Sequence, residues 1–119
     1  MSASEVDWGF LSRFKRRVYT LTAKIPKGYV ATYSQIAEII GSRKYARAVG
    51  NALHVKPFPP QIVPCHRVVK SSGDVGGYAA GVRVKINMLL DEGVEVVNGK
   101  VNLEKNLINM KLLKSLEVD

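Results

Sequence analysis

The chain has 119 residues, of which 46% are hydrophobic, and a formal net charge of +8. That length and apolar content suit one small globular domain with a single core. No apolar run approaches the roughly 20 residues that cross a bilayer, and the opening "MSASEVDWGF" has neither the basic start nor the apolar stretch of a signal peptide, so we expect no membrane association.

Cysteine and histidine are scarce in this sequence. The single cysteine, Cys65, cannot form an internal disulfide, so a reduced intracellular setting and a free thiol are expected. Together with His54 and His66 it makes too small and too badly spaced a set for a zinc site, so no metal is expected.

Positive charge is concentrated between residues 13 and 70, where Glu38 is the only acid. Such an uneven distribution of charge is typical of a protein that binds a polyanion. The alternative is a solvated face on an ordinary basic protein, and charge alone does not separate the two.

The first predicted element is an amphipathic helix over residues 7–23, where apolar residues recur at helical spacing. These apolar residues are Phe10, Phe14, Val18 and Leu21. Pro26 and Gly28 break the next segment, residues 24–33, which we expect to form a turn or a short extended piece.

Two short helices are predicted within about residues 32–55. The first opens at residue 32 or 33 and stops at Gly41, and the second covers residues 45–55. Two helices joined by a tight glycine-containing turn predict a helix-turn-helix. The second helix has a slim side that would let its backbone approach a partner, or that merely allows close packing in the core. That side consists of Ala46, Ala48, Gly50 and Ala52.

The middle of the chain is predicted to be irregular. The proline-rich connector at residues 56–63 does not suit a helix, and the glycine-rich loop at residues 71–81 is of a type that fits its backbone against a ligand. A further helix is predicted over residues 82–93, ending at Gly93.

A β-hairpin is predicted over residues 94–103, because Asn98-Gly99 suits a two-residue turn between alternating strands. The tail, residues 104–119, has the pattern of a helix. The sequence as a whole predicts one mainly α-helical domain over residues 1–119, with a small β-hairpin and a winged helix-turn-helix-like arrangement.

The thiol lies next to a histidine in "PCHRVV", residues 64–69. A thiol attacks well only as a thiolate, and its free pKa of about 8.5 leaves little thiolate near neutral pH, so Cys65 would need a base. Neighbouring side chains of an extended segment point to opposite sides, so His66 would act through a water or a backbone bend. A histidine base usually has its other nitrogen held by a carboxylate, for which Asp91 and Glu92 are the nearest candidates.

A family resemblance gives this pair its context. The stretch "IVPCHRVVKSSGDVGGYAAGVRVKINMLLDEG" closely resembles the active-site domain of the O6-alkylguanine-DNA alkyltransferases, whose hallmark is PCHRV, a glycine-rich loop with a tyrosine, and a lysine-bearing helix. The stretch "ATYSQIAEIIGSRKYARAVGNAL" resembles the helix-turn-helix of the same family. The resemblance runs from about Asp7 to about Leu103.

The resemblance implies a catalytic role for five residues. Cys65 corresponds to the acceptor that takes the alkyl group from a damaged guanine by in-line displacement and keeps it as a thioether, so no cofactor is expected. His66 corresponds to the water-linked base and Glu92 to the carboxylate behind it. Tyr33 corresponds to the phenol that protonates or hydrogen-bonds a ring nitrogen of the leaving guanine, and Lys85 to the lysine that supports this phenol.

The resemblance also implies how DNA is bound. The expected partner is double-stranded DNA containing O6-alkylguanine, bound from the minor groove by a monomer, with the damaged base rotated into a pocket. Arg47 corresponds to the arginine finger that fills the vacated stack, within a DNA-binding set of Tyr33, Arg43, Lys44, Ala46, Arg47 and Ala48. The expected pocket set is Pro64, Val75, Tyr78, Ala79 and Ala80. This function predicts a cytoplasmic protein associated with the nucleoid, or a nuclear one in a eukaryote.

The sequence departs from the family pattern in three places. The family normally carries a further N-terminal domain, sometimes with a structural zinc, which has no counterpart here. A connector asparagine that braces the active-site turn in many members is absent, with Lys56 nearest to its position. Ala79 stands where a serine or a larger residue is frequent, which affects the alkyl groups that fit.

Two other functions compete with alkyl transfer. Alkyltransferase-like proteins share the fold, usually replace the cysteine by tryptophan, and flag lesions for excision-repair proteins without repairing them; length favours this reading and Cys65 favours the enzyme. A plain helix-turn-helix transcription factor would leave "PCHRVV" and the helix from Lys85 to Glu92 unexplained.

Overall fold

The computed structural model describes residues 13–55 and 58–117 of the chain. Phe10, the predicted start of the first helix and Lys56 lie outside these residues. Within them the architecture is mainly helical with small β elements, as the sequence predicts. None of the helices in these two ranges has the length and hydrophobicity of a membrane-spanning segment.

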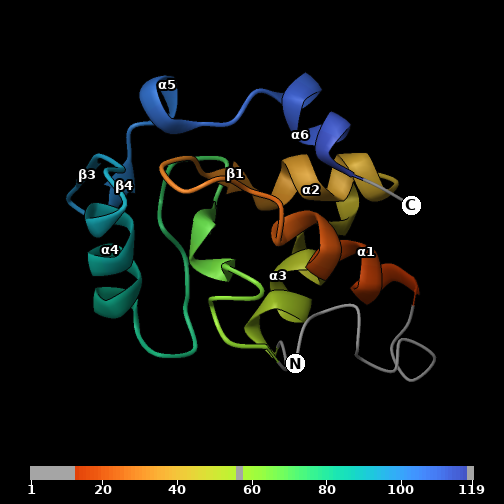
Figure 1. Ribbon diagram of the computed structural model, residues 1–119, viewed down its shortest axis with the longest axis horizontal. Helices are drawn as coiled ribbons and strands as arrows, with labels where there is room; N and C mark the ends of the chain where they lie inside the picture. The colour runs from red at the N-terminus through yellow and green to blue at the C-terminus, as the bar shows by residue number, and fades with distance from the viewer. Residues whose placement is uncertain (1–12, 56–57, 118–119) are drawn as a thin grey trace.

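The helix-turn-helix occupies one side of the molecule (Figure 1). It consists of α2 (Tyr33–Ile40) and α3 (Ala46–His54), joined by a short 3₁₀ helix η2 (Arg43–Tyr45), and α1 (Arg13–Thr22) packs against both. Thr32 opens α2 with a capping box, because its hydroxyl accepts from the Gln35 backbone N–H while the Gln35 side chain accepts from the Thr32 backbone N–H. The predicted helix-turn-helix is therefore confirmed.

The three helices enclose the larger of two hydrophobic cores. Their inward faces supply buried aliphatic side chains that pack with Tyr19 and Phe58. These aliphatic side chains are Val18, Leu21, Ile36, Val49 and Leu53. The small residues of α3 divide between two environments, since Ala52 is buried in this core whereas Ala48 is exposed.

A two-stranded parallel pair joins the helical half to the rest of the fold. Strand β1 (Ala31–Thr32) pairs with β2 (Val68–Val69) in the register Ala31 to Val68 and Thr32 to Val69. The sequence analysis expected an extended piece near β1 but did not predict this pairing, because two-residue strands carry no alternating pattern. The pair sets the end of β1, where α2 begins, beside the segment that follows Cys65.

The second half is built around α4 (Val82–Asp91) and a hairpin of β3 (Val96–Val97) and β4 (Lys100–Val101). Asn98 and Gly99 both have positive φ, at 53° and 75°, as a type I′ turn requires. The predicted hairpin is confirmed, and it covers a second core. That core consists of Val30, Val69, Val75, Leu89, Val94 and Val101.

The tail does not form the single helix that its sequence pattern predicts. It forms α5 (Leu103–Asn106) and α6 (Met110–Leu116), separated by an extended break. At this break the backbone pairs with Val30, which donates to Asn106 and accepts from Ile108. The Asn109 side chain then caps α6 by accepting from the Lys111 and Leu112 backbone N–H groups. Tertiary pairing and this cap therefore override the helical pattern.

Lys85 is the one lysine with a fully buried side chain among the described residues. It projects from α4 and donates to the Val68 carbonyl at 2.8 Å and to the Gly77 carbonyl at 3.2 Å, so it fastens α4 to β2 and to the glycine-rich loop. Burial lowers the pKa of Lys85 from 10.5 to about 8, although negative charge at Cys65 and Asp74 acts in the opposite direction.

The buried lysine makes stability depend on pH in a predictable direction. The lowered pKa means that the unfolded chain binds more protons than the folded one between about pH 8 and pH 10.5, so the free energy of unfolding rises with pH across this window. A Lys85→Met variant lacks this dependence. The difference in unfolding free energy, wild type minus variant, should therefore rise by about 3 kcal/mol between pH 7 and pH 10.5 in urea titrations.

The matched control is Leu89→Ala, which weakens the same helix without removing a titratable group. Its difference from wild type should stay constant over the same pH range. A constant difference for Lys85→Met as well would show that the lysine keeps its ordinary pKa in the folded protein.

Candidate active site

Cys65 lies in a single turn of 3₁₀ helix, η3 (Cys65–Arg67), immediately before β2. The sequence analysis reasoned from an extended segment and allowed for a bend in the backbone, and the structure shows a bend. The Arg67 backbone N–H bonds to the Pro64 carbonyl and that of Val68 bonds to the Cys65 carbonyl, which supplies the backbone bend. The thiol is largely buried and forms part of the wall of a pocket of about 290 Å³.

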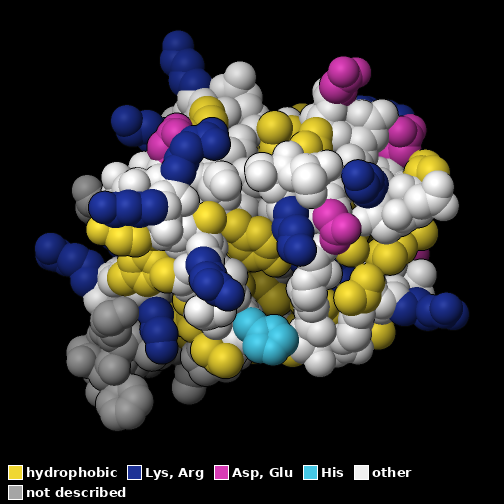
Figure 2. All heavy atoms as spheres, turned by 180° about the vertical axis from the view of Figure 1, so that it is seen from behind, with side chains coloured by type: hydrophobic (Ala, Val, Ile, Leu, Met, Phe, Trp, Pro, Cys, Tyr) yellow, Lys and Arg dark blue, Asp and Glu magenta, His cyan; other side chains and the backbone are white. Residues whose placement is uncertain are grey.

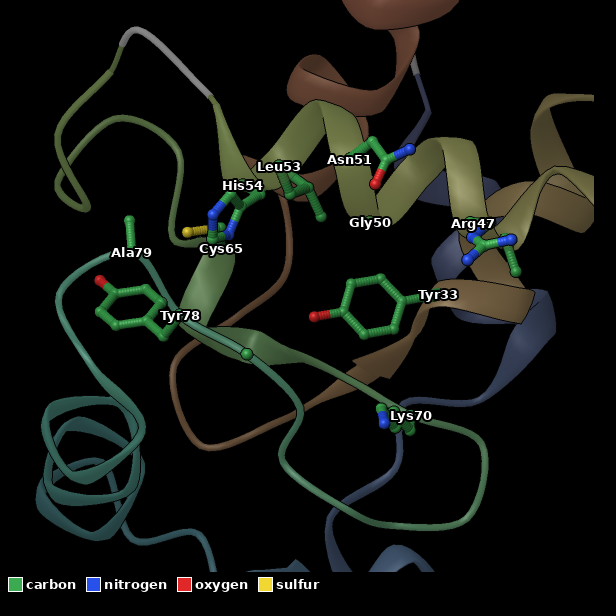
Figure 3. A pocket seen from close by; sticks show the side chains of 12 residues that line it. Tyr33, Arg47, Gly50, Asn51, Leu53, His54, Cys65, Lys70, Tyr78 and Ala79 are labelled. Carbon is green, nitrogen blue, oxygen red and sulfur yellow. The ribbon is translucent and has the colours of Figure 1, made fainter.

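The pocket lies between α3, the start of α2 and the glycine-rich loop (Figure 3). Cys65, His54, Tyr78 and Ala79 lie toward one end of it, with Tyr33 nearer the middle and Arg47 and Lys70 farther from the sulfur. The complete lining is Tyr33, Ala46, Arg47, Gly50, Asn51, Leu53, His54, Cys65, Lys70, Gly77, Tyr78 and Ala79.

His66 is buried beside the thiol and bonded to a carboxylate. Its Nε2 lies 3.0 Å from Glu92 Oε2, whereas Asp91, the other candidate, has an exposed side chain. Burial lowers the pKa of His66, and the hydrogen bond and charge of Glu92 only partly oppose this. A neutral His66 that donates from Nε2 keeps an unprotonated Nδ1, which has no hydrogen-bond partner among the described residues. Nδ1 is thus the nitrogen that can accept a proton.

Glu92 is itself held by an arginine that the sequence analysis did not assign to the site. Arg67 donates to both carboxylate oxygens of Glu92, at 2.9 and 2.7 Å, and to the Ile25 carbonyl at 2.8 Å. Burial alone would raise the pKa of Glu92, but the hydrogen bonds from Arg67 and His66 outweigh it and lower this pKa. The carboxylate therefore stays charged and orients the imidazole. Arg67 is the arginine of the PCHR motif, so the motif could have assigned this residue to the site.

Tyr33 presents its phenol to the pocket from the first residue of α2. Lys85 Nζ lies 3.4 Å from the phenolic oxygen, and burial, followed by negative charge at Cys65, raises the pKa of Tyr33 to about 12. The phenol therefore remains protonated at neutral pH and can donate. Two glycines leave room for it, since a Cβ at Gly76 would lie 3.4 Å from the hydroxyl and one at Gly50 3.8 Å from the ring.

The residues expected at the DNA surface lie along η2 and α3. Arg43, Lys44, Arg47 and Ala48 are exposed, and Ala46 and Arg47 also line the pocket. Arg43 pairs with Glu38 at 2.6 Å in an exposed ion pair. On the face shown in Figure 2, lysine and arginine side chains are spread around a hollow with a hydrophobic floor.

Of the expected pocket residues, the structure places Tyr78 and Ala79 in the lining and three others elsewhere. Val75 is buried in the second core, Pro64 is buried beside η3, and Ala80 is exposed near the end of the loop. The family resemblance was the reason for expecting them, but Val75 turns into the second core and neither Pro64 nor Ala80 reaches the lining.

The sequence analysis also missed lining residues on α3 and directly after β2. Asn51 and His54 follow Arg47 at positions i+4 and i+7 of α3, so helical spacing could have found them. Lys70 lines the pocket from the residue after β2. Among the described residues there is no group of three or more histidine, cysteine, aspartate or glutamate side chains that could hold a metal ion.

Comparison with known proteins gives the same family for sequence and structure. Residues 13–94 match the family described as 6-O-methylguanine DNA methyltransferase, DNA binding domain. A methylated-DNA–protein-cysteine methyltransferase of Methanothermobacter thermautotrophicus is 40% identical over 93 residues, which cover 78% of this chain and 51% of the relative. The Homo sapiens protein of the same name is 47% identical over 81 residues, covering 67% and 39%.

Solved structures extend this agreement. Schizosaccharomyces pombe Atl1, crystallised with damaged DNA containing O6-carboxymethylguanine, superimposes with a TM-score of 0.71 at 36% identity, covering 81% of this chain and 94% of that one. Mycobacterium tuberculosis OGT in complex with DNA gives 0.65 at 38% identity, covering 69% and 49%. The chain spans about half or less of the length of these methyltransferases. It belongs to the 6-O-methylguanine DNA methyltransferase family, through the DNA-binding domain of that family.

Proposed function

We propose that this protein repairs DNA by transferring an alkyl group from O6-alkylguanine in duplex DNA to Cys65, one group per protein molecule. The observation that carries this proposal is the position of the only thiol of the chain, in the wall of a pocket lined by Tyr33 and Tyr78. The neighbouring His66 is bonded to Glu92, which is the support that a thiol base requires.

The proposed step is an in-line displacement. The thiol proton passes to His66, the Cys65 sulfur forms a bond to the alkyl carbon, and the bond between this carbon and O6 breaks with its electron pair staying on the guanine. Tyr33 donates its phenolic proton to a ring nitrogen of the leaving base and is reprotonated from solvent, to which His66 releases the thiol proton, so that one proton moves from the thiol to the guanine overall. The products are a thioether on Cys65 and an unmodified guanine, and no cofactor takes part.

The surface around the pocket supports DNA binding by backbone contacts. Exposed basic residues on η2 and α3 suit contacts to phosphates, which bind without reading sequence. The exposed Ala48 and the half-buried Ala46 and Gly50 keep α3 slim enough to approach a minor groove closely. Rotation of the damaged base into the pocket costs a few kcal/mol, and in this proposal Arg47 offsets part of that cost by occupying the vacated stack.

Lesion binding without repair is the second candidate. It is supported by the structural similarity to Atl1, which was crystallised with damaged DNA containing O6-carboxymethylguanine. In that case the protein would mark O6-alkylguanine for excision-repair proteins. The presence of Cys65, with His66 and Glu92 bonded behind it, favours transfer.

Intact mass after incubation with methylated-guanine duplex DNA tests transfer. We expect one methyl group, about 14 Da, on the peptide that contains Cys65. Cys65→Ser should gain no mass but should bind the same DNA. Loss of binding in Cys65→Ser would show that the substitution damages the pocket, and binding without any mass gain in the wild type would favour lesion marking.

Variants of Arg47 and Tyr33 distinguish an effect on rotation of the base from an effect on the alkyl transfer itself. Arg47→Ala should slow repair of duplex DNA by more than about tenfold, yet leave reaction with a free alkylated guanine base nearly unchanged, because the free base needs no rotation. Tyr33→Phe removes a hydrogen-bond donor worth roughly 1 to 3 kcal/mol and should slow both reactions. Second-order rates of both variants on both substrates provide the comparison. Equal loss for Arg47→Ala on the two substrates would assign Arg47 to the pocket or the fold.

A further inference from the structure

His54 is a pocket residue to which the proposed reaction assigns no task. It is the last residue of α3, its side chain is exposed, and it lines the pocket together with Cys65. In Figure 3 its imidazole is seen toward the same end of the pocket as Cys65, and both residues line that pocket. No hydrogen bond joins this ring to another residue in the described ranges.

The geometry of the proposed reaction requires the alkyl group to occupy the end of the pocket near the Cys65 sulfur. An in-line displacement requires the alkyl carbon to approach the Cys65 sulfur closely, so the alkyl group points toward this end while the guanine ring lies farther out. The side chains at this end therefore limit the size of the alkyl group. On the loop side Ala79 contributes only a methyl group, and on the helix side His54 contributes an imidazole.

The neighbours of His54 are less able to adjust to a larger group. Leu53 also lines the pocket but is 4% exposed and packed in the larger core. Cys65 is held by the backbone of η3. His54 is exposed at the helix end, so its ring can be removed without opening a cavity in the core.

We propose that His54 sets the largest alkyl group that Cys65 accepts, by closing the helix side of the pocket at the sulfur. This inference rests on the proposed transfer to Cys65. The same sulfur–carbon bond forms and the same carbon–O6 bond breaks for every alkyl group. A substitution at His54 leaves the intrinsic reactivity of each group unchanged, so a change in the ratio of two alkyl rates between variants reports the space at this end.

A contact between His54 and a DNA phosphate is the rival explanation, because the ring lies on the same face of α3 as Arg47. The two explanations differ for free bases, which have no phosphate. Rates should therefore be measured with free guanine carrying either a methyl or a benzyl group on O6, and with the same two groups in duplex DNA.

We expect His54→Ala to raise the ratio of the benzyl rate to the methyl rate by about tenfold on the free bases, as is typical when a pocket gains room for a few carbon atoms. His54→Phe keeps the bulk of the ring without its nitrogens and should stay within about twofold of the wild-type ratio. Val55→Ala is the matched control, since Val55 is the next residue, is 64% exposed and does not line the pocket. Its ratio should equal that of the wild type.

An unchanged ratio in His54→Ala on the free bases would overturn the assignment. Slower reaction of both groups in duplex DNA with an unchanged ratio would identify a phosphate contact instead. Methyl transfer by the wild type from either form of substrate establishes that the reaction occurs. Its complete absence would overturn the proposed function, and the role of His54 with it.

Discussion

The parallel pairing of Ala31–Thr32 with Val68–Val69 is the contact on which the candidate site depends. Tyr33 follows the first strand and the PCHR turn precedes the second, so this short ladder brings the phenol and the thiol to one pocket. Two residues per strand form too small a ladder to be stable alone. Burial of both strands between the two cores and the Lys85 bond to the Val68 carbonyl stabilise it.

The electrostatic arrangement separates the groups that would exchange protons in the proposed reaction from the charged groups that hold them in place. Arg67 keeps Glu92 charged, and Glu92 orients a buried His66 that is neutral near pH 7. On the other side, Lys85 lies beside a phenol whose pKa is raised to about 12. The thiol therefore has an acceptor on one side and a donor on the other, and this polarity suits a displacement in which the nucleophile loses a proton and the leaving group gains one.

Local signals in the sequence were sufficient for the helices and the hairpin. The pattern after Thr32 that predicts α2 reflects a real capping box, and Asn98-Gly99 forms the turn that it predicts. What could not be predicted depends on contacts between distant segments: the pairing of β1 with β2, and the break in the tail where Ile108 bonds to Val30. In the site, the motif located the bonded pair of His66 and Glu92, whereas the pocket lining followed the turns of the loop and one face of α3.

Helix α3 has nine residues, and they contribute both to the larger core and to the lining of the pocket. Its inward side, with Val49 and Leu53, completes the larger core and fixes the helix rigidly. Its pocket side then presents Arg47 and His54 two turns apart, one far from the sulfur and one near it. A helix held by its core cannot tilt to accommodate a ligand, so differences in what fits must come from the side chains at the two ends of this face. Changes at one end should therefore act on DNA, and changes at the other on the alkyl group.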